Sequence, residues 1–167
     1  MACVALGANL GDALATVQQA LVDVGRLPDT QLLKASSLYR TAPYEAQGPD
    51  FINAVALVQT QLSAMGLLYA LQALELQSGR ERPYRNAPRT LDLDLIFYGD
   101  VVLSTPELTL PHPRWHARAF VLLPLSEIYP ERVTPAQLAA VQNQAIERIT
   151  GTVFALPQFG IQSSVES

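Results

Sequence analysis

The hydrophobic and polar positions along the chain follow two periods, which predicts a fold that mixes strands with helices. Short apolar runs over residues 2–9, 31–43 and 51–60 are typical of strands. A fourth strand is predicted where leucine alternates with Asp92 and Asp94. Polar or turn-forming residues separate these runs, so each is expected to be a separate element.

Helices are predicted between these strands, because apolar residues recur at helical spacing behind residues that can cap a helix. Asp12 precedes the first helix, and Ser63 precedes the second, which is expected to end near Gly79. Their buried positions are Leu14, Val17, Leu21, Val24, Leu67, Leu68, Leu71 and Leu74. The order β-α-β-β-α-β predicts an α+β, ferredoxin-like fold, with two helices on one face of an antiparallel sheet.

Additional helices are predicted towards the C-terminus. Prolines punctuate a loop over residues 105–116, and an apolar helix around 117–123 is expected to end near Pro124. A last helix is expected to begin at the sequence TPAQ, where Thr134 caps it and a glutamine three residues later completes a capping box.

Length and composition indicate one globular domain over residues 1–167, with a loose tail from about residue 151. Of the 167 residues, 49% are hydrophobic and 16% are charged, which excludes a disordered chain. The formal charge of −4 gives no general attraction to nucleic acid or to an anionic membrane. A single cysteine, Cys3, and the lack of signal-peptide or membrane-spanning patterns favour a cytoplasmic protein, which we expect to be a monomer.

The aspartates of the fourth strand are the first candidates for chemistry. Alternation places the carboxylates of Asp92 and Asp94 on one face and the leucines on the other. In one interpretation the two acids only form salt bridges with nearby arginines. In the other they bind a divalent cation such as Mg²⁺, which prefers carboxylate and phosphate oxygens and removes the repulsion between the acids.

Arginines crowd the segment just upstream of these acids, at positions 80, 82, 85 and 89. Taken alone, such a run is typical of a solvated basic turn. Beside an acid pair it can clamp a polyphosphate whose other oxygens hold the metal, because a guanidinium makes two-pronged contacts with phosphate. Together the two features indicate Mg²⁺–nucleotide chemistry.

The common phosphate-binding loops are missing from the sequence. Neither G-x-x-x-x-G-K-[ST] nor G-x-G-x-x-G occurs, so arginines and metal would have to hold a nucleotide. The glycines of GANLGD, Gly7 and Gly11, are expected to allow a tight turn between strand and helix.

Two further polar features have both an ordinary and a functional interpretation. His112 and His116 have a spacing that can hold zinc on a helix, but neighbouring prolines argue against a helix, and nearby arginines favour a phosphate role for His112. Asn53 interrupts an apolar strand, either as a buried amide with satisfied hydrogen bonds or as a donor and acceptor for a heterocycle. Phe51 or Phe120 could stack on such a ring.

Several motifs occur in a characteristic order: LGANLGD, SSLYRTAPYE, DFINAV, APRTLDLDLI, LTLPHPR and RAFVLLPLSEI. In this order and spacing they resemble 6-hydroxymethyl-7,8-dihydropterin pyrophosphokinase of folate biosynthesis, over about residues 3–130. The resemblance implies a ferredoxin-like transferase that moves pyrophosphate from ATP to the hydroxymethyl group of the pterin and releases AMP. Nothing matches the family beyond about residue 135, and we expect that part to have no role beyond packing.

The resemblance also implies roles for individual residues. Two Mg²⁺ ions would be bound by Asp92 and Asp94, which with the loop residues Arg82 and Arg89 would form the catalytic set. Contacts with ATP are implied for Gln72, Glu75, Arg82, Arg89, Leu95, Thr109, His112 and Arg118. Contacts with the pterin are implied for Thr41, Pro43, Tyr44, Asn53 and Phe120.

Fold alone leaves other functions open, because ferredoxin-like sheets also carry RNA-binding and ligand-sensing domains. RNA recognition would predict sheet aromatics in an RNP pattern and a basic surface, and the chain has neither. The alternative is a catalytically inactive module that binds pterin or nucleotide, and formation of AMP from ATP and the pterin separates the two.

Overall fold

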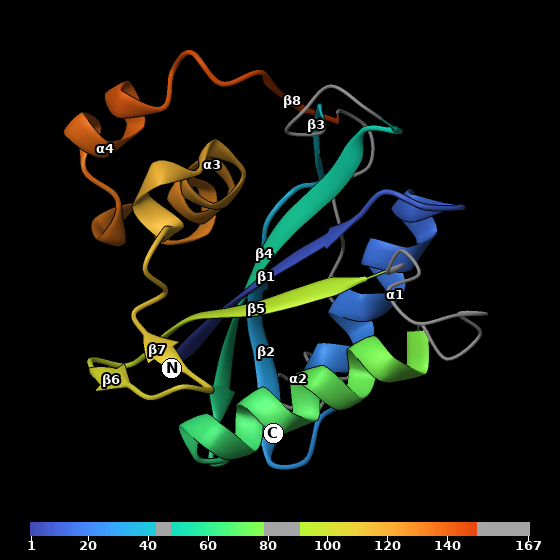
Figure 1. The fold of residues 1–167 in the computed structure, drawn as a ribbon, viewed down its shortest axis with the longest axis vertical. Coiled ribbons are helices and arrows are strands. Elements are labelled where there is room, and N and C mark those ends of the chain that lie inside the picture. The colour runs from blue at the N-terminus through green and yellow to red at the C-terminus, as the bar shows by residue number, and fades with distance from the viewer. Residues whose placement is uncertain (43–47, 79–90, 150–167) are drawn as a thin grey trace, which may run out of the picture.

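The computed structural model describes residues 1–42, 48–78 and 91–149 (Figure 1). Its strands are β1 (Ala2–Ala8), β2 (Thr30–Ala35), β3 (Tyr39–Thr41), β4 (Phe51–Thr60), β5 (Asp92–Tyr98), β6 (Leu103–Ser104), β7 (Thr109–Leu110) and β8 (Ile146–Arg148). Its helices are α1 (Ala13–Gly25), α2 (Ala64–Ser78), α3 (Ala119–Ile128) and α4 (Pro135–Ala140), with 3₁₀ turns η1 (Trp115–Ala117) and η2 (Pro130–Arg132).

The main sheet has the strand order β5-β1-β4-β3-β8, and β2 pairs with β4 beside β3. All of these pairings are antiparallel. Helices α1 and α2 cover one face of the sheet, and α3 covers the other (Figure 1). The predicted β-α-β-β-α-β order and ferredoxin-like class are therefore confirmed, with α3 and α4 as the additional C-terminal helices.

Two apolar clusters pack on the two faces of the sheet, as strand alternation requires. In β1, Val4 and Leu6 belong to the cluster under α1 and α2, whereas Cys3 and Ala5 belong to the cluster under α3. In β5, Leu93 and its leucine neighbours lie under α1 and α2. The aspartates between those leucines consequently lie on the face that α3 covers.

Local capping explains where three helices begin, as predicted. The Asp12 side chain accepts a hydrogen bond from the backbone N–H of Ala15 at 3.1 Å. Ser63 does the same for the N–H of Gly66 at 3.0 Å. Thr134 forms the complete capping box at the start of α4. Each cap satisfies a backbone donor that has no partner inside its helix.

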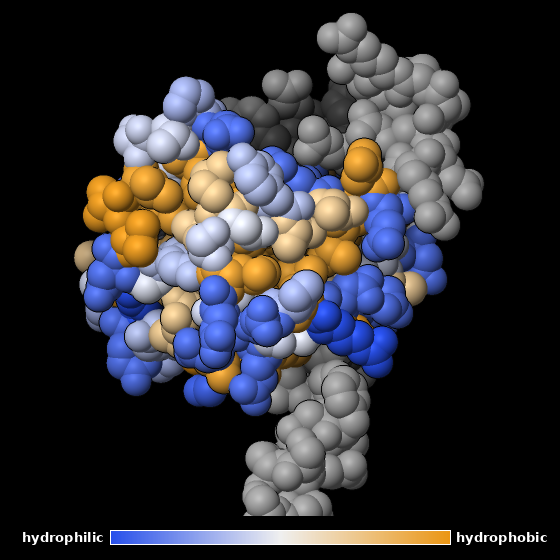
Figure 2. Space-filling view, turned by 90° about the horizontal axis from the view of Figure 1, so that it is seen from below, coloured by the Kyte–Doolittle hydropathy of each residue, from blue (hydrophilic) through white to orange (hydrophobic). Residues whose placement is uncertain are grey.

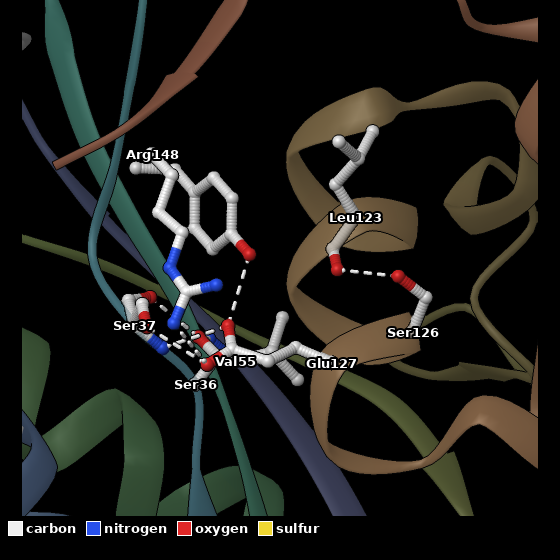
Figure 3. A network of polar contacts seen from close by, with 8 residues as sticks. Ser36, Ser37, Val55, Leu123, Ser126, Glu127 and Arg148 are labelled. Carbon is white, nitrogen blue, oxygen red and sulfur yellow. Dashed lines mark hydrogen bonds and ion pairs between the residues drawn. The ribbon is translucent and has the colours of Figure 1, made fainter. Parts of the chain in front are cut away.

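Residues 31–43 do not form the single strand that the sequence predicted. The chain leaves β2 after Ala35 and enters β3 at Tyr39, because Ser36 and Ser37 make other bonds. Ser36 Oγ accepts from the backbone N–H of Val55 at 2.9 Å, and Ser37 donates through its N–H and its hydroxyl to Glu127 at 3.0 and 2.8 Å. Figure 3 shows this network, which ties α3 to the sheet.

The predicted end of the apolar helix near Pro124 is wrong, because α3 continues to Ile128 with Pro124 inside it. A proline in a helix costs about 3 kcal/mol through the lost hydrogen bond and a steric clash. Apolar side chains on both sides of the proline are buried, namely Val121, Leu122, Leu125 and Ile128. Each contributes about 1.5–3 kcal/mol, so their burial outweighs the cost.

The sequence did not predict β8 or the β6–β7 hairpin. Strand β6 lies just before the predicted loop 105–116, and β7 lies inside it. Strand β8 pairs with β3 at the edge of the main sheet. The predicted tail, residues 151–167, lies outside the described residues.

The surface of the molecule is a mosaic of hydrophilic and hydrophobic residues on the face shown in Figure 2. Large hydrophobic side chains that are exposed include Leu76, Val102 and Tyr69. Among the helices of the described ranges, none combines the length and the apolar character needed to cross a bilayer.

Candidate active site

One row of residues crosses three strands at the end of the sheet. Gly7 in β1 lies opposite Asp92 in β5 on one side and opposite Asn53 in β4 on the other. The row lies on the α3 face, because Cys3 and Ala5 at alternate positions of β1 pack against α3. Gly7 has no side chain, so the surface between the carboxylate and the amide is left open.

A cavity of about 1040 Å³ stands over this row. Its floor comes from β1, β4 and β5, and its wall comes from the segment around η1, the start of α3, and Gln144 with Ala145. The predicted site residues that line it are Thr41, Asn53, Asp92, Asp94, Arg118 and Phe120. The fold thus brings candidates for the metal, the nucleotide and the heterocycle into one space.

The amide of Asn53 is fixed in orientation at the bottom of this cavity. Its side chain is buried, with the residue only 4% exposed, and Nδ2 donates to Thr41 Oγ1 at 2.9 Å. Oδ1 lies beside Gly7, where an added β-carbon would be 3.1 Å away. Within the described ranges, Oδ1 accepts no protein hydrogen bond, so the amide keeps acceptor capacity towards a ligand.

Gly7 therefore has a different role from the predicted one. Gly11 has a positive φ of 60° and allows the expected turn into α1, but Gly7 lies inside β1. A glycine in a strand interior often marks a close approach of another group, and here that group is the Asn53 amide.

Asp92 and Asp94 are partly exposed on the cavity side of β5. No cluster of three or more His, Cys, Asp or Glu side chains suited to a metal occurs in residues 1–42, 48–78 and 91–149. A cation bound there would take its remaining ligands from water and substrate. This donor set of two carboxylates fits Mg²⁺, which keeps several waters and binds substrate phosphates.

His112 is attached to the outer edge of β5 and presents one ring nitrogen. Its backbone N–H donates to the carbonyl of Ile96 at 2.7 Å, and its Nδ1 accepts from the backbone N–H of Arg114 at 3.1 Å. Neutral His112 consequently carries its proton on Nε2, where it can donate to a ligand oxygen. Burial lowers the pKa of His112, and the positive charges of Arg118 and Arg114 act in the same direction against the opposing effect of Asp94.

Arg118 lies at the junction of η1 and α3. Its guanidinium carbon is 5.4 Å from the centre of the Phe120 ring, a distance at which a cation–π attraction acts. Both side chains face the cavity from the α3 side. The nearby His116 packs its ring against Trp115, with ring centres 5.9 Å apart.

Five predicted nucleotide contacts within the described residues lie outside the cavity lining, namely His112 and the four that follow. Glu75 on α2 accepts from the backbone N–H of Leu93 at 2.7 Å, at the edge of β5 that pairs with no other strand of the main sheet. Gln72 is exposed on the same helix, and Thr109 is exposed on β7. The side chain of Leu95 is buried under α1 and α2, so only its backbone can meet a ligand.

The predicted residues Pro43, Tyr44, Arg82 and Arg89 lie outside the described residues. Gln144 and Ala145 line the cavity although the sequence did not single them out. Gly7 could have been found from its position inside a strand, whereas nothing local to Gln144 indicates its contact with α3.

Comparison with known proteins finds similar sequences over most of the chain. A family model described as 7,8-dihydro-6-hydroxymethylpterin-pyrophosphokinase (HPPK) matches residues 3–130. The chain is 44% identical over 155 residues to the 2-amino-4-hydroxy-6-hydroxymethyldihydropteridine pyrophosphokinase of Pseudomonas aeruginosa, covering 89% of this chain and 96% of that one. The protein of the same name from Synechocystis sp. is 42% identical over 151 residues, covering 90% of this chain and 77% of that one.

Solved structures share the fold at low sequence identity. A Plasmodium falciparum HPPK-DHPS triple mutant with SDX-DHP superposes with a TM-score of 0.58 at 15% identity, over 78% of this chain and 40% of that one. An HPPK-DHPS structure in complex with substrates covers 99% of this chain and 43% of that one, with a TM-score of 0.57 at 12% identity.

Proposed function

The chain belongs to the 7,8-dihydro-6-hydroxymethylpterin-pyrophosphokinase family, and on that premise we propose that its reaction takes place in the cavity between β5, β4 and α3. The reaction moves the pyrophosphoryl group of ATP to the hydroxymethyl oxygen of 6-hydroxymethyl-7,8-dihydropterin and releases AMP. It is a step of folate biosynthesis.

The observation that supports this location is the row that joins Asp92 to Asn53 across Gly7. The two ends are two strand spacings apart, which is about 10 Å. That span suits a bicyclic heterocycle whose amide edge meets Asn53 and whose hydroxymethyl arm extends towards the carboxylates. A cavity of about 1040 Å³ leaves room for the phosphates beside it.

We assign Asp92 and Asp94 to Mg²⁺, with two ions expected. Bound Mg²⁺ neutralises phosphate charge and lowers the pKa of a coordinated hydroxyl. The two carboxylates hold this charge at the β5 end of the cavity, and the remaining work of the protein is to position both substrates.

The nucleotide is proposed to lie along the outer edge of β5. Glu75 and His112 are both hydrogen-bonded to backbone groups of that edge, at Leu93 and Ile96. Strand alternation turns the backbone N–H and C=O of Leu95 outward between them, where they can bind the base. Gln72 and Thr109 lie on the elements that flank this edge.

Phosphate contacts are proposed for the Nε2–H of His112, at the outer edge of β5, and for the guanidinium of Arg118, on the α3 side of the cavity. Arg82 and Arg89 are proposed to clamp the phosphates as the transferred charge moves. A guanidinium on each side of a polyphosphate neutralises charge without competing for the metal.

The pterin is proposed to bind between Asn53 and Phe120. The hydrogen bond from Asn53 Nδ2 to Thr41 holds the amide plane, and Phe120 offers a ring face on the α3 side. Pro43 and Tyr44 complete the proposed contacts from the segment after β3.

We further propose a single pyrophosphokinase domain that acts as a monomer in the cytoplasm. Cys3 is fully buried in β1, and burial raises the pKa of its thiol, so the one cysteine is protected from oxidation. Sedimentation of the purified protein and fractionation of cells that express it test these two points.

A product assay tests the proposed function. ATP, Mg²⁺ and 6-hydroxymethyl-7,8-dihydropterin are incubated with the protein, and AMP and the pterin diphosphate are expected in equal amounts. Formation of ADP would indicate transfer of a single phosphoryl group instead. Binding of both substrates without turnover would identify an inactive binding module.

A further inference from the structure

The side chain of Gln144 joins the C-terminal part of the chain to the wall of the cavity. Its Oε1 accepts from the backbone N–H of Ala119 at 2.9 Å, and its Nε2 donates to the carbonyl of Ala117 at 2.9 Å. These two backbone groups lie on either side of Arg118. One amide therefore fixes the peptide groups before and after the arginine.

The N-terminus of α3 needs such a partner. Arg118 is the N-cap residue of α3, and its side chain makes no capping hydrogen bond. The N–H of Ala119, the first residue of the helix, has no partner within its own helix. Gln144 supplies that partner from a turn 25 residues further along the chain.

The segment that carries Gln144 is itself anchored to the opposite side of the cavity. Two residues later β8 begins, and Ile146 pairs with Thr41 in β3. Arg148 of β8 forms an ion pair with Glu127 of α3 at 3.4 Å (Figure 3). Gln144 is thus held between β3, which carries Thr41, and the wall, which carries Arg118.

We propose that Gln144 is a positioning residue for the reaction, acting through Arg118. Both polar atoms of its amide bond the backbone at 2.9 Å, and through these two bonds it holds the wall that carries Arg118. Because the amide is neutral, it does not capture the guanidinium of Arg118, which stays available for phosphate. Gln144 lies beyond residues 3–130, where the family model matches.

This proposal rests on the proposed role of Arg118 in binding ATP, and a double-mutant cycle tests the two separately. Affinity for ATP with Mg²⁺ is measured by calorimetry, without pterin, for Gln144→Ala, Arg118→Ala and the double variant. We expect Gln144→Ala to weaken binding about 3- to 10-fold, the equivalent of one or two net hydrogen bonds. In the Arg118→Ala background the same change should add less than about twofold.

Two further variants separate positioning from general packing. Gln144→Met keeps the length of the side chain but removes both hydrogen bonds, so it should bind ATP as weakly as Gln144→Ala. Gln142→Ala, in the same turn, removes an exposed glutamine that forms no side-chain hydrogen bond within the described ranges, and it should bind like the unmodified protein.

Other results of these affinity measurements would overturn either the role of Arg118 or the role of Gln144. Unchanged affinity in Arg118→Ala would overturn the proposed role of Arg118 in binding ATP. A clear loss in Arg118→Ala, together with Gln144→Ala that binds like Gln142→Ala, would overturn the role of Gln144 alone. If the losses of ATP affinity in the two single variants add in the double variant, Gln144 does not act through Arg118. If Gln144→Met binds ATP with full affinity, the hydrogen bonds of Gln144 are not what positions the wall.

Discussion

Gly7 and Asn53 face each other across β1 and β4 so closely that a β-carbon at position 7 would lie 3.1 Å from Asn53 Oδ1. The absence of a side chain at one position therefore sets the place of the amide at the other. In the proposed site this amide recognises the pterin.

Gly7→Ala should consequently weaken pterin binding while the protein stays folded. The new methyl group displaces the amide by a few tenths of an ångström, and overpacking of this kind costs about 1–3 kcal/mol of folding stability. The displaced amide no longer meets the edge of the heterocycle, so pterin affinity falls. Calorimetry with pterin and with ATP measures both affinities, and ATP should be affected less. Pterin affinity equal to that of the unmodified protein would show that the position of the amide is not critical.

Replacing either acid should abolish most of the activity. Asp92→Asn or Asp94→Asn removes half of the proposed metal-binding charge, and turnover should fall about 100-fold or more. For Asp94→Asn, loss of the like-charge repulsion should leave the melting temperature of the metal-free protein unchanged or higher. Asp100→Asn, at an exposed position after β5, is the control. Near-normal turnover in both site variants would favour the simple salt-bridge interpretation.

Removal of the Asn53 amide should affect one substrate more than the other. Asn53→Ala should weaken pterin binding by about 1–3 kcal/mol, because the heterocycle edge loses its polar partner. Gln59→Ala, at an exposed position of the same strand, should leave both affinities unchanged. Equal losses for pterin and ATP would argue against a specific contact.

The arginines upstream of β5 should matter most in the transition state. Arg82→Ala or Arg89→Ala should slow the chemical step about 10- to 100-fold in single-turnover experiments, with a smaller effect on ATP affinity. Lysine should rescue only in part, because it cannot make a two-pronged contact. Arg40→Ala, which removes an exposed ion pair with Glu147, is the matched control. An unchanged rate of the chemical step in both alanine variants would indicate that these arginines only decorate a solvated turn.

The lowered pKa of His112 predicts how stability depends on pH. The folded protein resists protonation of this ring relative to the unfolded chain, whose ordinary value is 6.5. The contribution of the neutral His112 ring to the free energy of unfolding is therefore fully present above about pH 6.5. It is lost as the pH falls below that value and through the lower pKa that His112 has in the folded protein. Urea unfolding between pH 5 and 7.5 should show a smaller loss on acidification for His112→Gln than for His116→Gln. Identical pH profiles would contradict this role.

Sequence reasoning succeeded where the signal is local. The starts of the helices follow from Asp12, Ser63 and Thr134, whose side chains bond backbone groups three residues away. The place of Asp92 and Asp94 on one face follows from the two-residue period of a strand. These features need no knowledge of distant residues.

Sequence reasoning failed where a residue is placed by a contact with another residue that is distant in the chain. The break between β2 and β3 depends on Glu127, which is 90 residues from Ser37. Strand β8 has three residues, two of them charged, and exists because β3 offers an open edge. The role of Gly7 depends on Asn53 in another strand. The apolar surface that keeps α3 intact past Pro124 is likewise assembled only by the tertiary fold.

The pairing of β8 with β3 limits how far the chain can be shortened from its C-terminal side without exposing a strand edge. A fragment that stopped at residue 130, where the family match ends, would retain the proposed metal ligands and Asn53. It would lose β8 and so expose the backbone N–H and C=O groups along one side of β3, which is a template for association between molecules. The smallest autonomous and soluble fragment should therefore extend at least to Ile149, whose N–H bonds the carbonyl of Leu38.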